Sequence, residues 1–204
     1  MIVKKQSGVL SENTSGNIPG MVDLLKEKLS CDVFPVHRLD REASGVMVYA
    51  TDKKGAARLS EEISQGKFKK EYLVIVHGVP EKEKGTMEDL LFKDSKKNKS
   101  YVVDRERKGV KKASLEYTLL GTKEVDGNKF SLVSVKLHTG RTHQIRVQFS
   151  SRNMPVVGDS RYGSDKKTEM CLFSHSIGFE NPYTKEQMTF ECQPDGEFWD
   201  IFGK

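Results

Sequence analysis

The chain has 204 residues, a length that fits one ordinary domain, and no apolar run approaches what is needed to span a bilayer. Its apolar fraction of 36% and charged fraction of 31% fit a soluble globular protein with a modest core. Three cysteines without a Cys-x-x-Cys pair favour reduced thiols over a disulfide framework or a zinc ribbon. Because the first residues lack the apolar core of a signal peptide, we expect a cytoplasmic protein.

The first quarter of the chain predicts a loop, a helix, a strand and a second helix. Residues 1–20 are rich in Ser, Asn and Gly and indicate a surface loop, whereas residues 21–29 have the apolar spacing of a short helix. The apolar residues 46–50 predict a buried strand. Asp52 is an expected N-cap for a following helix that ends at Gly66.

The rest of the chain is richer in strands. Two partly alternating segments flank the turn signal Asp126-Gly127-Asn128 and predict a long antiparallel hairpin. The other expected elements are strands at 72–76, 171–179 and 187–192, a helix at 142–150 and a short C-terminal helix. We therefore predict an α+β fold, a mixed and largely antiparallel sheet with flanking helices, in a single domain over residues 1–204.

Positive charge is concentrated in one segment. Residues 93–112 hold nine basic and three acidic residues, a net charge of +6, although the whole chain carries only +5. Such a stretch suits a surface that binds a polyanion, because each neutralised phosphate releases counterions. A solvated edge strand that uses lysine against aggregation is the alternative, and composition alone does not decide between them.

Two short segments could carry chemistry. His37-Arg38-Leu39-Asp40-Arg41-Glu42-Ala43-Ser44-Gly45 presents a carboxylate in a polar turn before a buried strand, and Arg141-Thr142-His143-Gln144-Ile145-Arg146 follows a Thr-Gly turn. A carboxylate and a guanidinium at element ends indicate a site in which the acid stays ionised and aimed.

These segments resemble the RluA-type pseudouridine synthases. The pattern His-Arg-Leu-Asp-x-x-x-Ser-Gly is similar to the signature of that family, and Gly140 to Arg146 to its second block. Tyr72 opens a strand after a helix, as the family's active-site tyrosine does. Val157-Gly158-Asp159-Ser160-Arg161-Tyr162-Gly163 resembles the family's Gly-Asp-x-x-Tyr-Gly turn.

The resemblance implies that the chain isomerises uridine to pseudouridine in tRNA or rRNA without metal or organic cofactor. Asp40 is then the catalytic carboxylate, acting as a nucleophile or as a ribose proton acceptor, and Arg141 holds it charged and aimed. Tyr72 provides a stacking platform for the extruded uracil.

The same resemblance implies contacts with RNA. Arg38 is expected to fill the space that the extruded base leaves, and a surface phosphate contact is its alternative. We also assign RNA binding to His37, Arg146, Lys96, Lys97 and Lys99. A metal site at the histidines is disfavoured because no third ligand has metal-site spacing. For the oligomeric state, a monomer is the default expectation.

Two departures from the family pattern concern substrate choice. The first strand carries Lys5-Gln6-Ser7-Gly8-Val9 where the family has Lys-Pro-x-Gly-Leu, and Ala43 stands where the family commonly has Thr. No separate RNA-binding domain is expected ahead of the catalytic one, so the RNA would be recognised by shape and by loops of this chain.

Two other functions stay open. One is an RNA-binding protein of the same fold without turnover, which would not need Asp40, Tyr72 and Arg141 together. The other is an unrelated acid-catalysed hydrolase or glycosidase, which requires a second carboxylate beside Asp40. Glu42 is near in sequence but need not face it.

Overall fold

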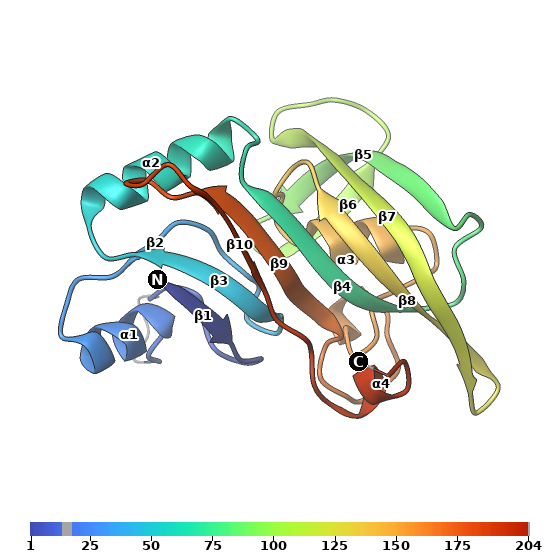
Figure 1. The fold of residues 1–204 in the computed structure, drawn as a ribbon. Helices are drawn as coiled ribbons and strands as arrows, with labels where there is room; N and C mark the ends of the chain where they lie inside the picture. Colours follow the sequence, from blue (N-terminus) through green and yellow to red (C-terminus); the bar gives the residue numbers. More distant parts are fainter. Residues whose placement is uncertain (14–17, 204) are drawn as a thin grey trace. The chain divides into compact units, whose positions relative to one another are not determined.

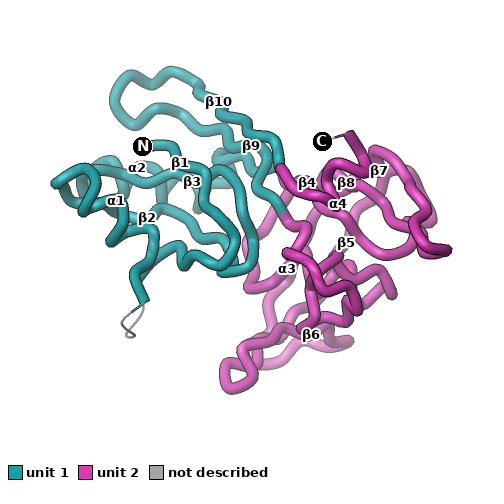
Figure 2. Tube along the Cα trace, turned by 90° about the horizontal axis from the view of Figure 1, so that it is seen from below, with its two compact units in different colours: residues 1–71, 173–194 teal, residues 72–172, 195–204 magenta. Residues whose placement is uncertain are grey.

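The computed structural model describes residues 1–13 and 18–203. These residues form two compact units, drawn in teal and magenta in Figure 2. Unit 1 contains residues 1–71 and 173–194, and unit 2 contains residues 72–172 and 195–204. The organisation of the chain as a single domain stays a prediction.

Unit 1 is built on a small mixed sheet in which β3 pairs with β1 and with β9 (Figure 1). In addition, β2 pairs with β3 and β10 pairs with β9. Its elements are β1 (Ile2–Lys5), α1 (Met21–Leu29), β2 (Phe34–Pro35), β3 (Ser44–Ala50), α2 (Lys53–Ser64), β9 (Leu172–Glu180, in this unit from residue 173) and β10 (Gln187–Glu191). The pair β3–β9 is parallel, and the pairs of β3 with β1 and β2 and of β9 with β10 are antiparallel. The helices α1 and α2 confirm the sequence prediction.

Local chemistry explains where α2 begins and what it covers. The Asp52 carboxylate accepts a hydrogen bond from the Gly55 N–H at 2.8 Å, so it satisfies one of the donors that a helix start leaves unpaired. One turn later, Leu59 is buried against Val46 of β3 and Phe179 of β9. Asp52 was the expected N-cap, and the apolar stripe of α2 packs on the sheet as its spacing indicated.

The strands β3 and β9 approach each other closely at one glycine of unit 1. Gly45 has φ +115°, and a Cβ added there would lie 2.3 Å from the carbonyl oxygen of Ser174. Only glycine fits both the conformation and the space, which explains the Ser-Gly that ends the first sequence block.

Unit 2 contains the larger, antiparallel part of the structure, with the strand order β4-β8-β7-β5-β6. Its elements are β4 (Lys69–His77, in this unit from residue 72), β5 (Lys84–Asp94), β6 (Lys99–Val103), β7 (Val110–Val125), β8 (Asn128–Leu137), α3 (Gln144–Ser150), the 3₁₀ turn η1 (Ser160–Tyr162) and α4 (Glu197–Asp200). The predicted hairpin is confirmed as β7–β8, joined by Asp126 and Gly127 with φ of 51° and 73°. Positive φ at both turn residues matches the twist of the two strands.

Helix α3 lies against β5 and β6 (Figure 1). Phe149 of α3 is fully buried and meets the ring of Tyr117 edge-on at a centroid distance of 6.0 Å. A second buried cluster joins Val147 of α3 with Leu91 of β5 and with Tyr162 of η1. The helix is short, but six of its seven residues are buried, so packing and not helix propensity holds it.

The fold class is the predicted one, with two differences in detail. Residues 2–5 form β1 inside a region expected to be a loop, and β5 had no counterpart among the predicted strands. Both strands contain lysines or acids that hide the alternation of apolar residues, and pairing with neighbours fixes them instead. Within the described residues, the three cysteines are free thiols and no helix is both long and apolar enough to cross a membrane.

Candidate active site

Asp40 lies in the aspartate turn (residues 40–43), which leads into β3. The Ala43 N–H donates to the Asp40 carbonyl at 3.2 Å and closes the turn. Directly before it, Leu39 is buried, and both of its backbone groups bind one side chain: Ser11 Oγ accepts from the Leu39 N–H at 3.0 Å and donates to its carbonyl at 2.8 Å. The half-buried Asp40 therefore projects from a backbone that is fixed on its N-terminal side.

Lys5 holds the other side of the aspartate turn. Its side chain is fully buried, and its ammonium group donates to the carbonyls of Arg41 at 3.0 Å, Val9 at 2.7 Å and Gln6 at 3.0 Å. Burial lowers the pKa of Lys5 to about 8, although the charges of Asp40 and Glu42 act in the opposite direction. The sequence marked Lys5 only as part of a family motif and gave no sign of this burial.

The two residues before Leu39 differ in exposure. The His37 imidazole is buried, accepts a hydrogen bond from the Val48 N–H at Nε2 (3.0 Å), and has its pKa lowered to about 3, first by burial and then by Lys70. A neutral ring on the core side of the turn supports β3, and the RNA contact of His37 stays a prediction. Arg38 is 73% exposed and pairs with Glu12 at 2.5 Å, a surface pair that costs little to exchange for a phosphate.

The arginine turn (residues 139–143) belongs to unit 2 and is organised by one amide side chain. Gln144 Oε1 accepts from the Arg141 N–H at 3.0 Å and from Thr139 Oγ1 at 2.7 Å, while its Nε2 donates to the Ser114 carbonyl at 3.1 Å. The Arg141 guanidinium is anchored by one of its five donors, since Nε binds the carbonyl of Lys112 at 2.9 Å. This anchor fixes the plane of a group suited to bind a carboxylate bidentately.

Tyr72 is a buried residue of β4 in unit 2. Asp40 is in unit 1, and Tyr72 and Arg141 are in unit 2. The catalytic set formed by these three residues stays a prediction.

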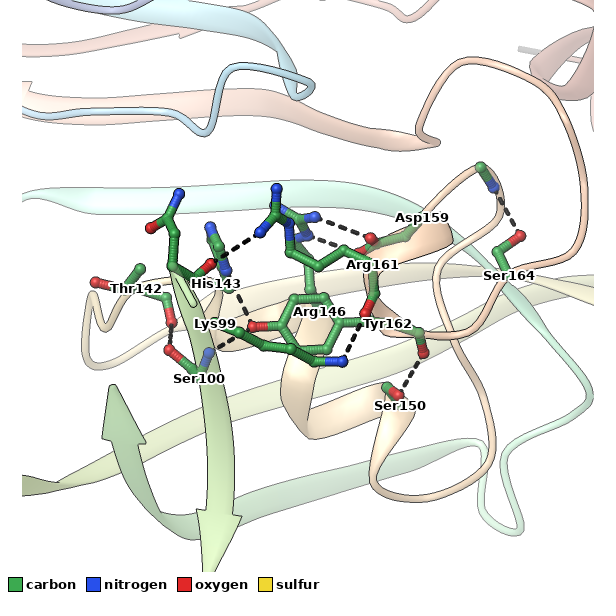
Figure 3. Close-up of polar contacts among 12 residues, drawn as sticks. Lys99, Ser100, Thr142, His143, Arg146, Ser150, Asp159, Arg161, Tyr162 and Ser164 are labelled. Atoms are coloured by element: carbon green, nitrogen blue, oxygen red, sulfur yellow. Dashed lines mark hydrogen bonds and ion pairs between the residues drawn. The ribbon is translucent and has the colours of Figure 1, made fainter. Parts of the chain in front are cut away.

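Arg146 has a different environment from the one expected. Its Nε and Nη2 donate to the two carboxylate oxygens of Asp159 at 2.6 and 2.8 Å, and both side chains are at most 2% exposed (Figure 3). This buried pair joins α3 to the loop before η1. The RNA contact of Arg146 stays a prediction, and the burial argues against it because a phosphate would have to replace Asp159.

The loop that carries Asp159 has its own glycine requirement. Gly158 has φ +80°, and a Cβ there would lie 2.4 Å from the Glu169 carbonyl oxygen. Substitution would therefore strain the backbone and displace the carboxylate that pairs with Arg146.

The basic turn (residues 95–98) joins β5 to β6. The Asp94 carboxylate accepts from the N–H groups of Lys96 and Lys97 at 3.0 Å each, which orders the turn while both lysine side chains stay exposed. Lys99 differs, since its ammonium donates to the Arg161 carbonyl at 2.7 Å and lies 5.0 Å from the centre of the Tyr162 ring. Lys96 and Lys97 are therefore better placed than Lys99 for phosphate contacts.

Among the described residues, no group of three or more His, Cys, Asp or Glu side chains is arranged to hold a metal ion. His138 pairs instead with Glu116 at 3.0 Å, and His143 lies 3.0 Å from the Tyr162 hydroxyl.

Comparison with known sequences identifies the family. A sequence model described as RNA pseudouridylate synthase matches residues 1–151, which include Asp40, Tyr72 and Arg141. The chain belongs to this family. The resemblance of its motifs to the RluA-type enzymes is thereby confirmed.

Several relatives are similar over much of the chain. The ribosomal large subunit pseudouridine synthase C of Buchnera aphidicola (subspecies Baizongia pistaciae) is 33% identical over 97% of this chain and 65% of its own length. The tRNA pseudouridine synthase C of Haemophilus ducreyi is 28% identical over 88% of this chain and 80% of its own. The chain spans 55% to 65% of the length of the first three curated relatives that it matches.

A solved structure shares the fold. The human RNA Pseudouridylate Synthase Domain Containing 1 protein matches with a TM-score of 0.80 and 24% identity, over 95% of this chain and 79% of that one. This similarity confirms the α+β fold class.

Sequence reasoning missed three residues that organise the candidate site. Lys5, Gln144 and Tyr162 all lie in or beside the quoted blocks, but their roles come from contacts with residues that are distant in sequence or in other blocks. Only their place in the motifs could have pointed to them.

Proposed function

We propose that the chain is an RNA pseudouridine synthase that converts uridine to pseudouridine in tRNA or rRNA. Membership of the family carries this proposal, because the matched residues 1–151 contain the three candidate catalytic residues. The anchored Arg141 and the aspartate turn held by Lys5 and Ser11 support it.

The proposed reaction needs no cofactor. The glycosidic C–N bond breaks, the uracil turns within the site, and its carbon 5 bonds to ribose C1′. The proton on carbon 5 passes to solvent and the released N1 takes up one proton, so the overall change is an isomerisation. Asp40 supplies the carboxylate that acts on the ribose, and Arg141 supplies a guanidinium suited to bind a carboxylate. Tyr72 stacks on the base, and Arg38 fills the vacated space in the RNA after releasing Glu12.

Release of tritium from uracil labelled at carbon 5 is the test, with unmodified tRNA and rRNA transcripts as separate substrates. We expect release by the wild type and none by Asp40→Asn, which should still bind RNA. Glu42→Gln is the matched control, because it neutralises an exposed carboxylate of the same turn and should remain active. Full activity of Asp40→Asn would refute the proposed role, and the active transcript would identify the RNA class.

We further propose that RNA phosphates bind the basic turn. Lys96→Glu with Lys97→Glu should weaken RNA binding and reduce the slope of log K against log salt by about 1 for each phosphate that is no longer bound. Lys123→Glu with Lys129→Glu reverses two exposed lysines of β7 and β8, outside the basic turn, and so controls for the same change of net charge. Equal slopes for the two variants would show that the lysines of the basic turn are solvated and do not bind RNA phosphates.

Cytoplasmic location and a monomeric state are also proposed. The RNA classes named for the relatives occur in the cytoplasm, which supports the first. Sedimentation equilibrium of the purified chain tests the second, and a dimer mass would refute it.

A further inference from the structure

One buried hydroxyl connects three separate segments of unit 2. The Tyr162 side chain rises from η1, and its hydroxyl accepts a hydrogen bond from the Ser100 N–H of β6 at 2.7 Å. The same oxygen lies 3.0 Å from Nδ1 of His143, the last residue of the arginine turn (Figure 3). Tyr162 is only 5% exposed, so these two contacts are made away from water, where losing them is costly.

The basic turn is bound to η1 by backbone carbonyls. Lys99 donates from its ammonium to the Arg161 carbonyl at 2.7 Å. In return, the Arg161 guanidinium donates to the carbonyls of Lys97 and Asn98 at 3.3 and 3.2 Å. These reciprocal contacts hold the backbone of the basic turn while the Lys96 and Lys97 side chains remain exposed.

The arginine turn is bound to the same strand, β6, and contains strain that needs support. Ser100 Oγ donates to the Thr142 carbonyl at 2.6 Å, one residue after Arg141. His143 has φ 53° and ψ 30°, a left-handed conformation that is strained for a non-glycine residue. Its contact with the Tyr162 hydroxyl is placed to hold this conformation and thereby the direction of the turn.

We propose that Tyr162 is a positioning residue. Its hydroxyl holds the arginine turn, and with it the Arg141 guanidinium, at a fixed position relative to the basic turn. RNA whose backbone is bound at the basic turn would then meet an Arg141 that is already placed. The inference rests on the proposed function, because only there does Arg141 take part in the reaction. Within unit 2, Ser100 of β6 contacts both the arginine turn and Tyr162.

The first variant is Tyr162→Phe. It removes the hydroxyl but keeps the ring over which the Arg146 guanidinium lies at 5.2 Å, so the packing of the cluster is retained. We expect kcat in the tritium-release assay to fall by at least about tenfold, since a misplacement near 1 Å is enough for such a loss. The RNA dissociation constant should change by less than about threefold, because the variant leaves the lysine side chains of the basic turn in place.

The matched control is Ser150→Ala. Ser150 Oγ donates to the Tyr162 carbonyl at 2.6 Å, so the variant loses a hydrogen bond of the same cluster without touching the arginine turn. It should lower stability in urea unfolding but leave kcat unchanged. This separates loss of stability from loss of position.

A double-mutant cycle tests whether Tyr162 acts through Arg141. In single-turnover measurements, Tyr162→Phe should cause no further loss when Arg141 is already alanine. Full additivity, or a kcat within twofold of an active wild type, would overturn the positioning role and leave the proposed function intact. An inactive wild type on both transcripts would instead refute the proposed function and this inference with it.

Discussion

The buried Lys5 ammonium group leads us to predict that the free energy of unfolding rises with pH in the alkaline range. Burial lowers the pKa of its ammonium group from 10.5 to about 8 in the folded chain. Between these values the unfolded state still binds a proton that the native state has lost, so the free energy of unfolding rises with pH. The full contribution over the window from pH 8 to 10.5 is about 3 kcal/mol, from about 1.4 kcal/mol for each pKa unit.

Other buried groups act in the opposite direction, so the comparison must be made against a variant. The pKa of the Cys171 thiol is raised by burial to about 12, and that of Tyr49 is also raised by burial, so both lower stability as the pH rises above their unfolded values. These contributions are shared by the wild type and by Lys5→Met. Their difference in unfolding free energy therefore isolates Lys5.

Urea unfolding at half-unit steps from about pH 7 to 10.5 measures this difference. We expect the wild type to gain about 3 kcal/mol relative to Lys5→Met across the series. Lys4→Met, which removes the preceding lysine of the same strand, should follow the wild-type curve. Parallel curves for the wild type and Lys5→Met would refute the reasoning, because the folded and unfolded states would then bind the same protons at Lys5.

Three further changes test the packing of the candidate site. Asp159→Asn should cost about 3–5 kcal/mol in urea unfolding because it removes the carboxylate charge that pairs with the buried Arg146 guanidinium, and a loss below about 1 kcal/mol would contradict this. Ser11→Ala leaves both backbone groups of Leu39 unpaired and should cost about 1–3 kcal/mol by the same measurement, whereas an unchanged midpoint would argue that these groups find new partners. Gly158→Ala combines a left-handed backbone with a collision at 2.4 Å and should cost about 2 kcal/mol or more, so an unaltered melting temperature would show that the loop relaxes.

The sequence predicts the regular elements of this fold well wherever one local pattern decides them. The capping carboxylate of Asp52, the apolar stripe of α2 and the Asp-Gly turn of the β7–β8 hairpin each act within a few residues. The strand β5 was missed because its burial comes from pairing with β6 and β7 and not from its own charged sequence.

The candidate site was predicted less completely, and for a physical reason. The motifs placed Asp40 and Arg141 in turns at element ends, as the structure has them. Sequence spacing did not reveal that Arg146 pairs with Asp159, because that contact depends on how α3 packs beside η1. A charged residue in a motif can thus belong to the core as readily as to the surface.

The close approach of β3 and β9 at Gly45 bears on how the first sequence block, residues 37–45, is interpreted. Gly45 is required by the neighbouring Ser174 carbonyl, His37 accepts a hydrogen bond from the β3 backbone, and Leu39 is buried in the core, so these three residues of the block serve the fold. A homologous chain that lost its aspartate would still need those residues to fold. A match to this block therefore indicates the scaffold, and under the proposed function turnover depends in addition on Asp40, Tyr72 and Arg141.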